Sequence, residues 1–193
     1  MGRSSLHTAD GLLDAAVDLF AADGARGVTM SGVARAAGAP SGSVYHRFPD
    51  RAALLAALWR RTVDAFGAAY DAELGDAPDP AAAVRAARWV VEWCRREPSS
   101  AAILHAGPSS FEPDSWSPAD RDAHALARKA REAAMSRAIA SVARQAGVRR
   151  DEAAFAMVGL PLAVVGQHLR VSEVVPAGAG GLVERLAARL LGL

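Results

Sequence analysis

Side chains able to make directed hydrogen bonds are crowded into one short stretch near residue 45. Hydroxyls and guanidinium groups bond to phosphate oxygens and to the edges of base pairs, and a glycine among them lets a helix sit deep in a groove. This chemistry suits recognition of a nucleic acid duplex. The residues concerned are Ser41, Gly42, Ser43, Tyr45, His46, Arg47 and Arg51.

Two very short helices joined at Gly38 are needed to present these side chains. Thr29 and Ser41 each precede one helix and carry a hydroxyl that can accept from the free N–H groups of a helix start. Gly38 can adopt the left-handed conformation that turns the chain between the helices. The spacing therefore predicts a helix-turn-helix unit, whose second helix lies in the major groove of DNA.

Apolar spacing separates an inward face from an outward face on both short helices. In the first helix the apolar residues recur at i, i+3, i+4 and i+7, which leaves Arg35 outside. In the second helix Val44 and Phe48 point inward, so its polar residues crowd the other side. The apolar positions of the first helix are Met30, Val33, Ala34 and Ala37.

The outward residues divide by their expected contacts with DNA. The small residues 41–43 are expected to read bases, Tyr45 to contact a phosphate, and Thr29 to combine a cap with a phosphate contact. Arginines on either side supply a local positive field. The predicted DNA-binding residues are Thr29, Arg35, Ser41, Gly42, Ser43, Tyr45, His46, Arg47 and Arg51.

The order of these features resembles the N-terminal domain of the TetR/AcrR family of transcriptional regulators. The resemblance begins with a helix from Thr8 to Asp23 and ends in Ala53-Leu54-Leu55. Between them come Gly24, Gly27, Thr29, Val33-Ala34, Ala37-Gly38 and the run Tyr45-His46-Arg47-Phe48-Pro49-Asp50-Arg51. Gly32 departs from the family's bulkier or charged residue, and Asp50-Arg51 replaces its commoner Ser-Lys pair. Asp keeps the capping oxygen and Arg keeps the charge.

Composition limits the remaining possibilities. The chain has 193 residues, 51% of them hydrophobic, and a formal net charge of +1, so it can bury a sizeable core. Cys94 is the only cysteine, which excludes an intramolecular disulfide and a Cys-based zinc site. The N-terminus has no apolar signal core, and no run approaches the ~20 apolar residues of a membrane span. We expect a cytoplasmic protein with no cofactor, no metal and no membrane partner.

The rest of the chain predicts an all-α fold of about nine helices, because no stretch alternates apolar and polar residues. A helix-turn-helix domain over 1–50 continues into a linking helix over 50–73, and 74–193 forms a C-terminal domain. In that domain helices are expected over 79–97, 99–106, 117–147, 151–171 and about 182–191, with a loop over 108–117. The helix over 117–147 is expected to bury Leu126, Ala130, Ala134, Met135, Ala138, Ile139 and Val142.

The helix over 151–171 is apolar on nearly every side from Ala153 to Val165, which predicts a partner, and Pro161 should kink it. The family resemblance implies that the last two long helices form a four-helix dimer contact. A homodimer also fits two half-sites of a palindromic operator about one helical turn apart. The predicted interface residues are Val158, Leu162, Val165, Leu169, Leu186 and Leu190.

Large apolar side chains in the C-terminal helices favour a small, largely apolar effector of unknown identity. Its predicted contacts are Trp89, Trp93, Leu104, His105, Phe111, Trp116, Met135, Phe155 and His168. Aromatics at helical spacing also fit plain core packing, and Cys94 fits either a small core residue or a redox-sensing thiol. The family implies a population shift, in which the effector favours a dimer whose recognition helices are wrongly spaced for DNA.

Other function classes have weaker support. No Gly-x-Ser-x-Gly elbow, phosphate loop, His-Glu-x-x-His pair or paired carboxylates point to an enzyme. Asp120, Asp122 and His124 fall on different faces of a helix, so they do not form a metal site. The sequence thus predicts a repressor that binds operator DNA as a homodimer and is released by an effector. The alternative is a helical protein–protein adaptor, or a regulator without a small-molecule ligand.

Overall fold

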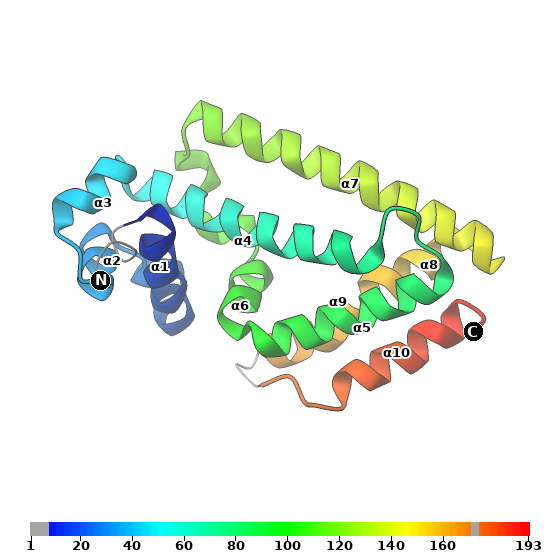
Figure 1. The fold of residues 1–193 in the computed structure, drawn as a ribbon. Helices are drawn as coiled ribbons and strands as arrows, with labels where there is room; N and C mark the ends of the chain where they lie inside the picture. Colours follow the sequence, from blue (N-terminus) through cyan, green and yellow to red (C-terminus); the bar gives the residue numbers. More distant parts are fainter. Residues whose placement is uncertain (1–7, 171–173) are drawn as a thin grey trace, which may run out of the picture. The chain divides into compact units, whose positions relative to one another are not determined.

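The computed structural model describes residues 8–170 and 174–193, and all its regular elements are helical (Figure 1). Counting the continuous run from α8 to α9 as one helix, this part of the chain has nine α-helices and no strand, so the predicted fold class is confirmed. The α-helices are α1 Ala9–Asp23, α2 Met30–Ala36, α3 Ser41–Arg47, α4 Arg51–Leu74, α5 Pro80–Arg96, α6 Pro98–Ala106, α7 Pro118–Ala146, α8 Arg150–Ala154, α9 Leu160–Leu169 and α10 Ala179–Leu190. Shorter turns are the 3-10 segments η1 Gly24–Gly27, η2 Pro108–Phe111 and η3 Pro113–Ser115, and the π-helical segment η4 Phe155–Gly159.

The chain folds into two compact units. The head unit comprises the residues up to Asp64 together with Ser99–Leu126, and the body unit comprises Ala65–Pro98 and Ala127–Leu193. This division differs from the predicted one, which assigned everything after residue 73 to a C-terminal domain. The segment from 99 to 126 belongs with the head because Ile103, Phe111 and Trp116 are buried in the head's own core.

The core of the head unit forms where α1, α2, α3 and the first half of α4 bury their apolar faces. Thr8 caps α1 by accepting from the Gly11 N–H at 3.1 Å, and Leu12, Leu13, Ala16 and Phe20 of α1 are buried. Asp50 caps α4 by accepting from the Ala53 N–H at 2.8 Å. The fully buried aliphatic side chains of this core are Leu12, Ala16, Val28, Val33, Val44, Leu54, Leu55, Leu58 and Ile103.

In the body unit α5 is the central helix and packs against α9 and α10 (Figure 1). Its start is set as predicted, because Asp79 accepts from the Ala82 N–H at 2.6 Å and Pro80 occupies the first turn. Arg88 of α5 pairs with Glu184 of α10 at 2.7 Å. Close packing of these two helices uses Gly180, where an added Cβ would lie 2.3 Å from Glu92 Oε1.

The helix from Arg150 to Leu169 contains a widened turn at η4. Pro161 has no N–H, and its ring would clash with the Met157 carbonyl in a regular α-helix. The predicted kink is realised as a π turn directly before the proline, where the Leu160 N–H bonds to the Phe155 carbonyl.

The same helix corrects one expectation from the sequence. The helix has 20 residues, and an 18-residue window within it reaches a mean hydropathy of 1.3, which meets the length and composition of a membrane span. The expectation that no segment comes close was therefore wrong. Composition alone cannot distinguish a span from a core helix, and α9 packs against α5 and α10.

Helix α7 buries far less than its sequence predicts. Leu126 is 72% exposed, Ala130 and Ala134 are exposed, and only Val142 of the predicted stripe is buried, with Ala143 beside it. The prediction of a continuous buried stripe was wrong. Alanine-rich helices carry a weak distinction between faces, since alanine is accepted both in cores and on surfaces.

Candidate nucleic-acid interface

Helix α2 begins and ends where its sequence predicts. The Thr29 hydroxyl accepts from the Gly32 N–H at 3.0 Å and caps the first turn. Gly38 has a φ of +61°, and it donates to Arg35 while the next residue, Ala39, donates to Ala34. This pair of bonds is the Schellman arrangement, which a glycine makes at little steric cost. The turn therefore fixes α3 against α2.

Helix α3 starts one residue earlier than predicted. Its N-cap is Pro40, whose carbonyl accepts from the Ser43 N–H at 2.9 Å, and Ser41 is the first helical residue. The prediction that Ser41 caps the helix was therefore wrong, because a proline with extended ψ already supplies the entry geometry. The Ser41 side chain is exposed at the helix start.

One face of α3 is buried and the other is open. Val44 is fully buried and Phe48 nearly so, whereas Tyr45 is 56% exposed. An added Cβ at Gly42 would meet nothing within 4 Å, so the glycine is not required by internal packing. We call the outward set the α3 face; it consists of the exposed Ser41, Gly42, Tyr45, His46 and Arg47 and the half-buried Ser43. Thr29 and Arg35 are also exposed, on the neighbouring α2.

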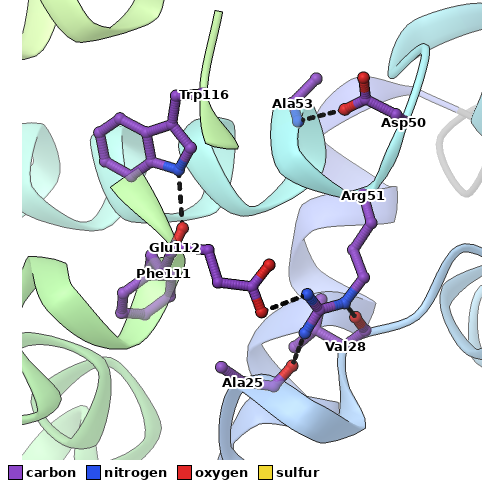
Figure 2. Close-up of polar contacts among 8 residues, drawn as sticks. All are labelled: Ala25, Val28, Asp50, Arg51, Ala53, Phe111, Glu112 and Trp116. Atoms are coloured by element: carbon purple, nitrogen blue, oxygen red, sulfur yellow. Dashed lines mark hydrogen bonds and ion pairs between the residues drawn. The ribbon is translucent and has the colours of Figure 1, made fainter. Parts of the chain in front are cut away.

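Arg51, a predicted DNA contact, is occupied within the head unit (Figure 2). Its Nε donates to the Val28 carbonyl at 2.8 Å, its Nη2 to the Ala25 carbonyl at 2.6 Å, and its Nη1 pairs with Glu112 Oε1 at 2.6 Å. All three nitrogens of the guanidinium thus have acceptors inside the protein. Sequence reasoning could not find these contacts, because the acceptors lie 23, 26 and 61 residues away along the chain.

Four of the predicted effector contacts lie in the head unit. Phe111 is fully buried and stacks on Phe20 with ring centroids 5.0 Å apart, and the Trp116 indole N–H donates to the Phe111 carbonyl at 2.7 Å. Both belong to the hydrophobic core of the head. Leu104 is half-buried beside that core and His105 is exposed.

The other predicted effector contacts lie in the body unit, and two of them join an aromatic cluster. Phe66 and Tyr70 of α4 meet Trp89 and Trp93 of α5, with ring centroids between 4.9 and 6.3 Å apart. Sequence reasoning named the two tryptophans and missed Phe66 and Tyr70. Their i, i+4 spacing on one predicted helix was the available signal.

Tyr70 is the most unusual member of this aromatic cluster. It is 5% exposed, its hydroxyl has no hydrogen-bond partner, and burial together with Asp71 raises its pKa to about 12. Buried hydroxyls are normally paired, because leaving one unpaired costs about 1–3 kcal/mol.

Elsewhere in the body unit, Met135 lines an open groove of about 430 Å³, while Phe155 is 49% exposed and His168 half-buried. The groove does not bring other predicted effector contacts together. Its lining residues are Arg131, Glu132, Met135, Ser136, Ile139 and Arg150.

The predicted dimer residues differ in their accessibility. Leu162 is 57% exposed, whereas Val165 is 3% exposed and lies in the core of the body unit. Half-buried positions make up the rest, namely Val158, Leu169, Leu186 and Leu190. Phe155 and Leu182, which the sequence did not assign to an interface, are further large apolar side chains open to solvent.

Reactive and metal-binding chemistry has little support in the described ranges. Cys94 is 8% exposed, and burial raises the pKa of its thiol to about 11, which suppresses the reactive thiolate. No group of three or more His, Cys, Asp or Glu side chains there could hold a metal ion. His124 packs edge-on against Trp116, and Asp120 accepts from Ser117 and pairs with Arg60.

Comparison with known proteins shows a likeness between the start of the chain and one family. Residues 12–58 match the family model described as bacterial regulatory proteins, tetR family. A search of curated protein sequences gives no match.

Solved structures extend the likeness to the whole chain. A TetR-like transcriptional regulator from Rhodococcus sp. RHA1 is 21% identical with a TM-score of 0.69, covering 100% of this chain and 98% of that one. A second tetR-family regulatory protein from Rhodococcus RHA1 is 22% identical with a TM-score of 0.71, covering 98% and 96%. A TetR family regulator from Marinobacter aquaeolei VT8 is 17% identical with a TM-score of 0.70, covering 98% of each chain.

At these identities the solved structures establish the fold, while the family model identifies the helix-turn-helix. The resemblance predicted from the sequence is confirmed: the chain carries the TetR-family DNA-binding domain and has the TetR-family fold.

Proposed function

We propose that this protein is a ligand-responsive repressor that binds a palindromic operator as a homodimer. The observation that carries the proposal is the α3 face, whose polar residues are exposed apart from the half-buried Ser43, while Val44 and Phe48 are buried. A helix with this division can enter a major groove without disturbing the core of its domain. Action on DNA implies a cytoplasmic location.

Dimerisation is supported by the apolar side chains open to solvent near the C-terminus. Phe155, Leu162 and Leu182 are each more than two-fifths exposed, at 49%, 57% and 41%. These exposed side chains of the body unit are the apolar surface that a protein partner would cover. A second copy is the partner that two-fold symmetric operator binding requires.

The α3 face leads to a direct test with a single hydroxyl. We expect Tyr45→Phe to leave the fold intact, because the side chain is largely exposed, and to weaken binding to all DNA sequences alike. Loss of one phosphate hydrogen bond corresponds to roughly a 3- to 10-fold loss of affinity per head. Gel shift against the DNA upstream of the coding sequence, with wild type and variant compared at equal salt, measures this change.

An unchanged affinity in Tyr45→Phe would remove Tyr45 from the contact set. If the protein is an adaptor or an enzyme, the wild-type protein should give no sequence-selective gel shift.

For the effector we propose the aromatic cluster of Phe66, Tyr70, Trp89 and Trp93. An apolar molecule carrying an oxygen acceptor would give the buried Tyr70 hydroxyl the partner that it lacks. Binding there would shift the population of dimer states and release the operator.

A pair of probes that differ in one acceptor tests this effector proposal. Wild type is expected to bind 2-acetylnaphthalene about 3- to 10-fold more tightly than 2-ethylnaphthalene, because only the ketone accepts from Tyr70. Tyr70→Phe should abolish that preference without lowering thermal stability, since it removes an unpaired buried hydroxyl. Calorimetric titration measures both affinities; equal binding of the two probes to wild type would refute the role of Tyr70.

A further inference from the structure

The segment between α6 and α7 contains a backbone conformation that needs an explanation. Glu112 has a φ of +55°, and no other non-glycine residue in the described part of the chain has a positive φ. A side chain with a Cβ is disfavoured in this left-handed region, and such strain persists only where the surroundings enforce it.

Glu112 lies between two anchored aromatic residues, Phe111 and Trp116, which Figure 2 shows joined by a hydrogen bond. Phe111 is buried between Phe20 and Trp59, at centroid distances of 5.0 and 5.2 Å. Trp116 closes the segment by donating its indole N–H to the Phe111 carbonyl. With both neighbours anchored, the left-handed turn at Glu112 directs its carboxylate to Arg51 at 2.6 Å.

Arg51 transmits this contact to the start of the DNA-binding unit. Its two other bonds hold the carbonyls of Ala25 and Val28, which form the turn immediately before Thr29. Thr29 caps α2 and is itself a predicted phosphate contact. Glu112 is thus connected through one guanidinium to the backbone that sets the position of α2.

Stability alone does not account for this arrangement. The side chains of Arg51 and Glu112 are 30% and 49% exposed, and ion pairs this exposed contribute little to folding. The left-handed backbone at Glu112 opposes folding. Residues that keep a strained backbone without stabilising the fold are typical of binding sites, where their position is needed for contact with the partner.

We infer that Glu112 is a positioning residue for DNA recognition, acting through Arg51 on the turn that precedes α2. The inference rests on the proposed function. It also gives the segment 107–117 a role in the head unit. The sequence had assigned Phe111 and Trp116 of this segment to an effector pocket.

Glu112→Gly separates positioning from stability. Glycine adopts the left-handed conformation freely, so thermal stability should stay the same or rise, while the carboxylate is lost. We expect operator affinity to fall by about 3- to 30-fold. Removing a negative charge would by itself tighten binding to DNA, so the positioning role and a mere charge effect predict opposite signs.

Asp114→Asn is the matched control, because it removes a negative charge from an exposed side chain of the same segment. It should leave affinity unchanged or slightly higher. A second readout needs no DNA: Glu112→Gly should speed amide hydrogen exchange at residues 25–32 and leave exchange in α1 unchanged.

The outcomes are distinguishable. If wild type binds its operator and Glu112→Gly binds equally well with unchanged exchange, the inference fails and the proposed function stands. If wild type shows no sequence-selective binding, the proposed function fails, and the inference with it.

Discussion

Raising the salt concentration from 50 to 200 mM is expected to weaken operator binding about 100-fold. Arg47 is exposed on the α3 face and Arg35 is exposed beside it on α2. A dimer presents each of these arginines twice. Four neutralised phosphates give a slope of about −3.6 in log affinity against log salt, because each releases condensed counterions. Fluorescence anisotropy titrations of a labelled operator at several salt concentrations measure the slope.

Two variants calibrate this slope. Arg47→Ala should make the slope shallower by about 1.8, since a dimer loses two charges, whereas Tyr45→Phe should leave it unchanged because a phenol releases no counterion. Operator binding that is insensitive to salt would contradict phosphate contact by this face.

Phe111→Ala is expected to destabilise the protein by about 3–5 kcal/mol. Phe111 is fully buried and contacts two other aromatic rings. Removal of its ring therefore leaves a cavity that the core cannot fill. A phenylalanine that lined an open effector pocket would behave differently, since its truncation would change the stability of the unliganded protein little. Urea denaturation followed by circular dichroism distinguishes the two roles.

Leu126→Ala serves as the control for Phe111→Ala. Leu126 is 72% exposed, so its truncation should change the free energy of unfolding by less than about 0.5 kcal/mol. If Phe111→Ala also changed the free energy of unfolding by so little, Phe111 would be better explained as part of an effector pocket.

The helix-turn-helix could be predicted from the sequence because its determinants are local. The Thr29 cap reaches three residues ahead, and the Gly38 turn joins residues at most five apart. Such short-range bonds leave a clear pattern in residue types. The one local error, at Ser41, came from ranking a hydroxyl above the proline that precedes it.

Contacts between distant segments could not be predicted in the same way. Arg51 and Glu112 are 61 residues apart, and neither residue type indicates the other. Phe111 and Trp116 were recognised as large apolar side chains, but composition does not say whether such a side chain fills a core or lines a pocket. The pairing of Phe66 and Tyr70 with Trp89 and Trp93 likewise depends on how α4 and α5 meet.

Selection of bound sequences from a random duplex library tests whether two copies of the α3 face read DNA together. We expect enrichment of an inverted repeat whose half-sites lie about one helical turn, ~34–36 Å, apart, because each half-site contacts one of the two α3 faces of a dimer. Enrichment should weaken in Tyr45→Phe without a change in the selected sequence. No enriched sequence, or an enriched sequence without two-fold symmetry, would contradict operator binding by a homodimer.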